Sequence, residues 1–127
     1  MRRRIMTIVI VGALLAALGL LEHVSVTNLT DEALAITQEI LADVRADELD
    51  AAMQKARALD RMWDERAVRL EMMVDHACTD DVRFALSRLI GALECGDRTS
   101  AMIYTGELEG SVEHVSEHEE ISMQNIL

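Results

Sequence analysis

The sequence has very few aromatic residues and no proline. Among 127 residues only Trp63, Phe84 and Tyr104 are aromatic, so a core must be built from Leu, Ile, Val, Ala and Met. Without proline, and with only six glycines, the chain has few residues that interrupt a helix. Its many Ala, Leu, Glu, Arg and Met residues therefore predict an all-α fold.

Basic residues are scarce after the first four positions. Of the 12 Lys and Arg residues, three are Arg2, Arg3 and Arg4, whereas all 23 Asp and Glu residues follow Leu21. From Glu22 onward, nine basic and 23 acidic residues give a net charge of −14. Such a domain is repelled by phosphate backbones, and it has no basic stripe interleaved with aromatic residues. We expect no nucleic-acid partner.

Recognisable catalytic motifs are also missing. No Ser or Cys lies in a nucleophile elbow, and there is no glycine-rich phosphate loop. Asp75 and His76 are adjacent, but neighbouring residues on a helix point about 100° apart, which is a poor geometry for a catalytic dyad. We expect His76 to cap the end of its helix instead. The sequence thus predicts neither an enzyme nor a bound cofactor.

An uncharged run from Ile5 to Leu21 follows the three arginines. Seventeen helical residues at ~1.5 Å each span about 25 Å, the short end of what crosses a bilayer core of ~30 Å. The run exceeds the 7–15 apolar residues of a typical signal peptide, and no small-x-small cleavage site follows it. It therefore predicts an uncleaved membrane anchor. The alternative is a helical protein that is secreted after the run is removed as a signal.

The arginines predict the orientation of this anchor. They flank only its N-terminal side, and the next basic residue is Arg45. Because positive charge stays on the cytoplasmic side, residues 1–27 form the expected cytoplasmic tip and anchor in the cell membrane. Residues 28–127 form the expected extracytoplasmic domain. Gly12 and Ala16 are small residues four apart, a spacing that lets two spanning helices pack closely.

Four amphipathic helices are predicted after the anchor. Thr30 caps the expected start of the first, with Asp31 and Glu32 in its first turn. The second is expected at 47–76, beginning at Asp47. Thr79 caps the third, which Gly96 closes, and Asp97 caps the fourth, which continues to about Glu117. The final ten residues lack helical periodicity. The expected inner positions recur at spacings of three and four: Leu29, Ala33, Ile36, Ile40 and Val44; Leu49, Ala52, Ala56, Leu59, Trp63, Leu70 and Met73, with Arg66 or Ala67 between; Val82, Ala85 or Leu86, Leu89 and Leu93; and Ala101, Tyr104, Leu108, Val112 and Val115.

Helices of this kind, with short connections, bury their apolar stripes only against one another. The predicted fold is an N-terminal transmembrane helix followed by a small antiparallel bundle of about four helices. The stretch LIGALECGDRTSAMIYTGELE resembles one helical hairpin of the tetratricopeptide kind. No second copy at a fixed period is evident.

Several short motifs are spread along the chain: the short N-terminal span, the Trp63 helix, Val74-Asp75-His76, Leu86-Ser87-Arg88-Leu89, Gly96-Asp97, His114-Val115 and Asn125-Ile126-Leu127. Together they resemble the DUF4363 family, small membrane-anchored bacterial proteins of unknown function. The resemblance runs over nearly the whole chain, and it implies a helical fold and a membrane location but no activity. Ala77-Cys78-Thr79 depart from the family, whose members tend to have further acids after the Asp-His pair.

Histidine and sulfur residues raise the alternative of a metal site. His114 and His118 are four apart, so one helix face carries both, and His76 or the acids of the C-terminal tail are the candidate further ligands. Met72 and Met73 lie near His76 and Cys78, a set typical of soft metals, but methionine also fills gaps in a core that is short of aromatics. We expect core packing for the methionines and a solvated surface for His114 and His118.

Cys78 and Cys95 lie at opposite ends of the third predicted helix. Their expected Cα separation of about 25 Å is far above the ~7 Å limit for a disulfide. We expect no bond between them.

Two functions from different classes follow. The first is a non-enzymatic interaction module, anchored by residues 5–21, that binds another protein or a second copy of itself. The second is an extracytoplasmic metal-binding or metal-sensing domain that uses His76, His114 and His118.

Overall fold

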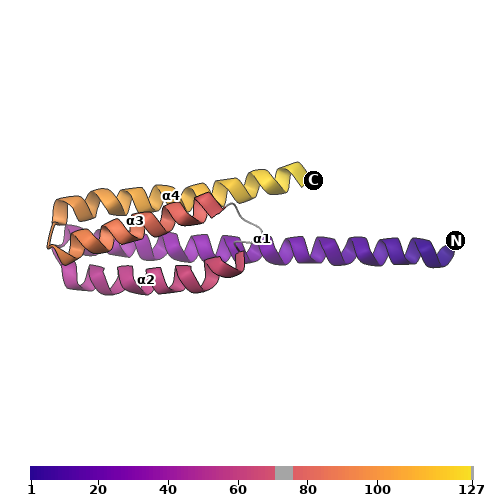
Figure 1. Cartoon of the computed structure of the whole chain (residues 1–127), viewed down its shortest axis with the longest axis horizontal. Coiled ribbons are helices and arrows are strands. Elements are labelled where there is room, and N and C mark those ends of the chain that lie inside the picture. The colour runs from indigo at the N-terminus through magenta and orange to yellow at the C-terminus, as the bar shows by residue number, and fades with distance from the viewer. Residues whose placement is uncertain (71–75, 127) are drawn as a thin grey trace.

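The protein is an antiparallel arrangement of four α-helices, seen in a computed structural model that describes residues 1–70 and 76–126 (Figure 1). All regular secondary structure in these residues is helical: α1 (Arg2–Arg45), α2 (Leu49–Leu70), α3 (His76–Glu94) and α4 (Arg98–Ile126). Consecutive helices run in opposite directions. The predicted all-α bundle with one long apolar N-terminal helix is confirmed.

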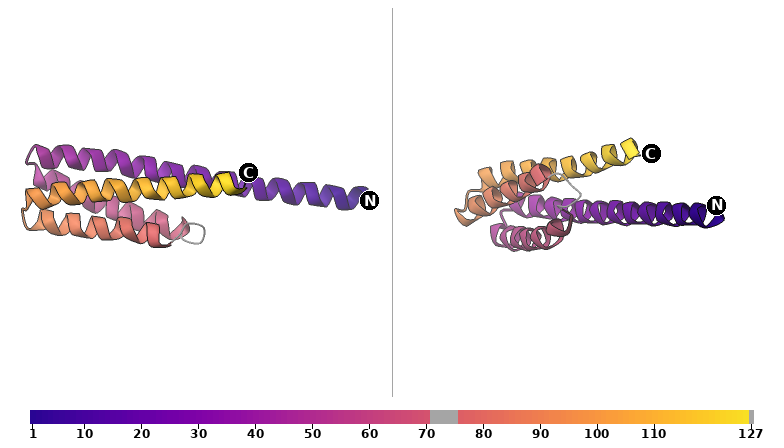
Figure 2. Two further views of the ribbon diagram at one scale, coloured as in Figure 1. Left: turned by 90° about the horizontal axis from the view of Figure 1, so that it is seen from above. Right: turned by 45° about the vertical axis from the view of Figure 1, so that its right-hand side comes forward.

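Each helix of the bundle packs against two neighbours. α1 contacts α2 and α4, and α3 also contacts α2 and α4, so the four helices enclose one core. The C-terminal half of α1 belongs to this bundle, whereas its N-terminal half extends beyond it (Figures 1 and 2). The predicted hairpin of 89–109 is the end of α3, a tight turn and the start of α4.

The predicted helix start at Asn28–Glu32 is wrong, because α1 continues without a break from Arg2 to Arg45. No proline interrupts the chain, and no glycine lies between Gly19 and Arg45. Thr30 does not cap a helix: its hydroxyl donates to the carbonyl of Thr27 within α1, 3.1 Å away. A threonine takes this bond when its own backbone is already helical, so the pattern that favours a cap is satisfied inside the helix.

Two turns of the same geometry close one end of the bundle. After α1, the Asp47 amide donates to the Val44 carbonyl and the Glu48 amide to the Asp43 carbonyl. This is a Schellman motif with Asp47 in the left-handed region (φ 59°). Asp47 was predicted to begin a helix; that is wrong, because α2 begins at Leu49. An aspartate tolerates this conformation better than most residues do.

The second turn follows α3 and confirms its prediction. Gly96 has φ 66°, and the Asp97 amide donates to the carbonyl of Ala92, 2.9 Å away. The Asp97 carboxylate then accepts from both the amide and the hydroxyl of Ser100. Gly96 thus ends α3, and Asp97 caps α4, as the sequence indicated.

The boundary between α2 and α3 differs from the expected one. α2 was predicted to reach residue 76, but His76 is instead the first residue of α3, so the prediction that His76 caps the end of the preceding helix is wrong. Thr79 does not cap α3: it is buried inside the first turn, and its hydroxyl donates to the carbonyl of His76. The predicted roles of Met72, Met73 and Asp75 concern positions outside the described residues.

The C-terminal stretch was predicted to be non-helical, which is also wrong. α4 continues to Ile126, although its apolar periodicity ends near Val115. Helices propagate at little cost once they are formed, and the stretch contains no proline and no glycine after Gly110. The helical backbone therefore extends past the residues that pack in the core.

The predicted apolar faces form the core. Most of the expected inner residues are buried, and Leu49, Ile36 and Tyr104 are half-buried against them. Ala67, rather than Arg66, fills the gap after Trp63. Four threonines are also buried, which their sequence pattern did not predict. Two of them, Thr37 and Thr105, each donate a hydrogen bond to the carbonyl four residues earlier. These internal bonds let a hydroxyl enter an apolar core without leaving a donor unpaired.

Polar contacts link each helix of the bundle to its neighbours. α1 and α2 are joined by Lys55 with Asp43, 2.7 Å apart, and by Arg66 with Glu32. The hydrogen bond and the charge of Asp43 raise the pKa of Lys55. Further ion pairs between helices are Arg57–Glu94 and Arg83–Asp64, which join α2 to α3, and Arg88–Glu107, which joins α3 to α4.

Candidate functional site

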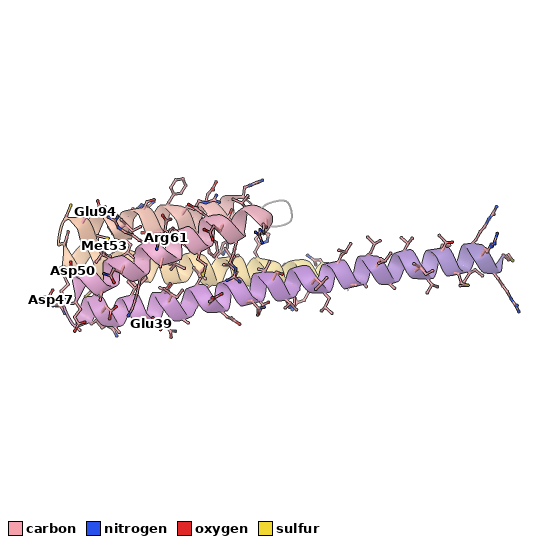
Figure 3. All side chains as sticks on the ribbon, turned by 90° about the horizontal axis from the view of Figure 1, so that it is seen from below. Glu39, Asp47, Asp50, Met53, Arg61 and Glu94 are labelled. Carbon is pink, nitrogen blue, oxygen red and sulfur yellow. The ribbon has the colours of Figure 1, made fainter. Side chains whose placement is uncertain are left out.

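The most distinctive surface is the apolar N-terminal half of α1. Large side chains in it are exposed all around the helix; Ile8, for example, is 70% exposed and Leu15 is 64% exposed. Figure 3 shows side chains projecting all along this part of α1, which no other element covers, and nitrogen-bearing side chains at its tip. An apolar helix that is exposed on every side differs from the amphipathic helices of the bundle, because it has no face that prefers water.

Length and composition make α1 the single helix, within the described chain, that could cross a membrane. The apolar helix at the core of a soluble protein meets the same criteria, but such a helix is mostly buried, whereas none of this apolar window is buried. An N-terminal signal sequence also meets them. The exposed helix is therefore a candidate membrane anchor.

A shallow pocket of about 220 Å³ lies where α1 enters the bundle. Its lining is polar and basic: Ser25 and Asn28 from α1, with Arg66 and Arg69 from α2. Arg66 is engaged by Glu32, while Arg69 is exposed near the end of α2. Two guanidinium groups can hold an anion. The Ser25 hydroxyl donates to the carbonyl of Leu21, and none of the four described lining residues is a general base that could activate it.

A second depression, of about 280 Å³, lies along α3 and α4 at the opposite end of the bundle. Arg88, Asp97, Ser100 and Tyr104 contribute its polar groups. Arg88 forms an ion pair with Glu107, and the Asp97 carboxylate accepts a hydrogen bond from the Ser100 hydroxyl. These contacts stabilise the bundle and leave no evident catalytic arrangement.

The candidate histidine ligands are only partly brought together. His114 and His118 are exposed on α4, and their ring centroids lie 6.3 Å apart in an edge-on arrangement. His76 lies at the start of α3. Over residues 1–70 and 76–126, no group of three or more His, Cys, Asp or Glu side chains is placed to hold a metal ion. The metal hypothesis thus has a histidine pair and no third ligand among the described side chains.

The two cysteines are separated as the helical spacing predicts. Cys78 is buried in the first turn of α3, whereas Cys95 is exposed just after its last turn, and neither is in a disulfide. Cys78 belongs to the core cluster. Cys95 is therefore the accessible thiol of the two.

Sequence reasoning missed one acid with a perturbed pKa. Partial burial on α2, together with the charge of Asp64, raises the pKa of Asp60, and Arg83 and Arg61 oppose the shift. Arg83 from α3 donates to Asp64, 3.2 Å away. The spacing of four between Asp60 and Asp64 was the available signal. The group lies in an ion-pair network between α2 and α3, which is a structural role.

Comparison with known proteins gives one match. No curated protein and no solved structure matches the chain. The family model described as "Domain of unknown function (DUF4363)" matches residues 21–126, which begins where α1 leaves its apolar half and includes the whole bundle. Because this match covers most of the chain, the protein belongs to the DUF4363 family.

Proposed function

We propose that this protein is a non-enzymatic interaction module held at the cell membrane by residues 5–21, with its bundle outside the cytoplasm. The observation that carries the proposal is the fully exposed apolar window of α1, which is continuous with the bundle. Burying such a surface in lipid removes a large apolar area from water. A backbone that is entirely helical satisfies its own hydrogen bonds there.

The proposed orientation rests on charge. Arg2, Arg3 and Arg4 precede the span, and the acidic bundle follows it. Basic residues stay in the cytoplasm, so the bundle is placed on the opposite side. Acids contribute little to this rule, so the three arginines carry the proposed orientation.

Exposed apolar side chains on the bundle support the interaction role. Phe84 on α3 is 57% exposed and Ile103 on α4 is 64% exposed. The core takes up other large side chains, such as Trp63, but leaves these two at the surface. Aromatic and large aliphatic residues are typical anchors of protein interfaces. Two adjacent helices therefore each present an apolar side chain for a protein partner or a second copy of the chain.

Two measurements on the full-length chain test this proposal. Fractionation is expected to recover the chain with membranes, and recovery in the cytosol would contradict the anchor. A reagent that modifies thiols but does not cross membranes is expected to label Cys95 in intact cells or spheroplasts. Protection of Cys95 there, with labelling after lysis, would reverse the orientation.

The interaction role needs its own test. The full-length protein is cross-linked in its native membrane, and the adducts are compared with those of Phe84→Ser and Ile103→Ser. We expect a discrete adduct that at least one substitution removes, while exposed Val68→Ser on α2 leaves it unchanged. A chain that remains monomeric, with no adduct, would contradict the interaction role.

Cleavage is the remaining alternative for the N-terminal segment. Sequencing the N-terminus of the mature protein distinguishes the two outcomes. An anchor retains Arg2–Arg4, whereas a secreted protein begins near the end of the apolar run.

A further inference from the structure

The charged residues of α1 and of α4 end at the same height along the bundle axis. The guanidinium of Arg98 donates to the carbonyls of Val44 and Arg45, 2.9 and 2.6 Å away, which fixes the register of the two helices. Both helices rise by ~1.5 Å per residue, and they run antiparallel. Counting about 22 residues away from this contact, forward from Arg98 along α4 and backward from Val44 along α1, therefore leads to Glu120 and Glu22, which lie at the same height. These are the last charged positions before the apolar run of α1 and before the uncharged stretch 121–126 of α4.

The end of α4 lies beside the apolar half of α1 without packing on it. Figures 1 and 2 show α4 extending past the bundle, level with the exposed part of α1 and diverging from it. Ile121 is 58% exposed. Among the described residues no other helix covers Ile121, so this side chain is open to a partner outside the bundle.

We propose that residues 121–126 of α4 dock in the membrane interface beside the span of α1, with lipid covering Ile121. This inference rests on the membrane anchoring proposed above. The level of the uncharged segment identifies the occupant. The same count places residues 121–126 level with residues 21–16 of α1, the last turns of the proposed span, so they lie at the boundary between the lipid headgroups and the acyl chains when residues 5–21 lie in the bilayer.

The composition of the segment suits an interfacial position. It combines Ile121 and Ile126 with exposed Gln124 and Asn125, and it carries no charge. Apolar and uncharged polar side chains both find partners at the boundary between headgroups and acyl chains. The acids that end at Glu120 oppose deeper insertion, because anionic charge is disfavoured in the bilayer. The bundle thus contacts the membrane at two points, which restricts its tilt.

Spin labels on the full-length protein in vesicles of phosphatidylcholine and phosphatidylglycerol test the proposal. Cys95→Ser removes the exposed thiol, while Cys78 is buried. In that background, Ile121→Cys, Gly110→Cys and Leu20→Cys each introduce one label. Gly110 is the control position, since it is exposed on the same helix, a Cβ added there meets no atom within 4 Å, and it lies about three full turns from Ile121, so both face the same way. Collisions of the label with oxygen, which is concentrated in lipid, indicate a lipid environment. Collisions with a water-soluble nickel chelate indicate an aqueous one.

We expect the ratio of oxygen to nickel accessibility at 121 to be several-fold above that at 110 and to approach that at 20. A label at 20 in lipid with a label at 121 that behaves like the one at 110 would overturn the docking of α4 but keep the anchor. A label at 121 that is shielded from both reagents would also overturn it, in favour of a protein contact. A label at 20 in water would overturn the anchor and the docking together.

Discussion

Arg98 at the start of α4 caps the end of α1, since its Nε donates to the carbonyl oxygen of Val44, 2.9 Å away and 54 residues distant in sequence. A second nitrogen, Nη2, donates to the carbonyl of Arg45. The last carbonyls of a helix lack partners within it and carry partial negative charge. Arg98 therefore gives the Arg45 carbonyl a donor, adds a charged donor to the Val44 carbonyl that already accepts from the Asp47 amide, and joins the first helix of the bundle to the last.

The first prediction concerns this cap. Arg98→Ala is expected to lower the free energy of unfolding by about 1 kcal/mol, because it leaves two carbonyls without their charged donor. Chemical denaturation of fragment 24–127, followed by circular dichroism, measures the change. Arg57→Ala is the matched control, since Arg57 forms an exposed ion pair with Glu94, and such pairs contribute roughly 0–1 kcal/mol. Equal losses in the two variants would contradict a special role for Arg98.

The second prediction concerns the sole tryptophan. Trp63 is fully buried, and its Nε1 donates to the carbonyl of Thr79, 3.3 Å away. Trp63→Ala is expected to cost about 3–5 kcal/mol through the cavity that it leaves. Trp63→Phe retains most of the apolar volume and should cost less, although the Thr79 carbonyl loses its donor. Urea titration of both variants checks the order, and an equal loss in both would show that the hydrogen bond dominates the packing.

The third prediction compares the two turns. Gly96→Ala places a Cβ on a left-handed residue that has no atom within 4 Å of the added carbon, so the expected cost of about 1 kcal/mol comes from the backbone alone. Asp47 has nearly the same φ in the matching turn. Asp47→Gly is therefore expected to stabilise the protein, by a few tenths of a kcal/mol to about 1 kcal/mol. Thermal melts of both variants test these opposite signs.

The fourth prediction concerns pH. Hydrogen bonds from the hydroxyl and then the amide of Ser100 lower the pKa of Asp97 below its ordinary value of 3.8. The stabilisation from ionised Asp97 is thus complete above the unfolded pKa of 3.8, and it is lost as pH falls through the lower folded pKa. We expect the difference in melting temperature between the protein and Asp97→Ala to shrink on acidification to about pH 3 and below.

Asp60 provides a comparison of opposite sign. Burial and Asp64 raise its folded pKa above 3.8, so its ionisation destabilises the fold as pH rises from 3.8 through that higher folded value. Asp60→Asn removes this penalty, so the free energy of unfolding of the variant should exceed that of the unsubstituted protein by a margin that grows with rising pH. An advantage that falls with pH would show that Arg83 and Arg61 outweigh the desolvation.

The amino-acid sequence by itself determined the helical class, the faces that pack in the core and the turn at Gly96 and Asp97. These features depend on local chemistry: apolar spacing, a residue without Cβ and a carboxylate that bonds to nearby amides. Trp63, Leu89 and Leu108 could be assigned to the core for this reason, and the apolar run 5–21 could be identified as a candidate span.

Only the tertiary structure decided where the helices begin and end and which distant residues meet. Thr30 and Thr79 have the sequence pattern of caps but lie inside helices, because a hydroxyl bonds equally well to a carbonyl of the preceding turn. The cap of Arg98 on α1 and the common height of Glu22 and Glu120 depend on how α1 and α4 are aligned. Such alignment is set by the packing of the whole bundle, which no local pattern encodes.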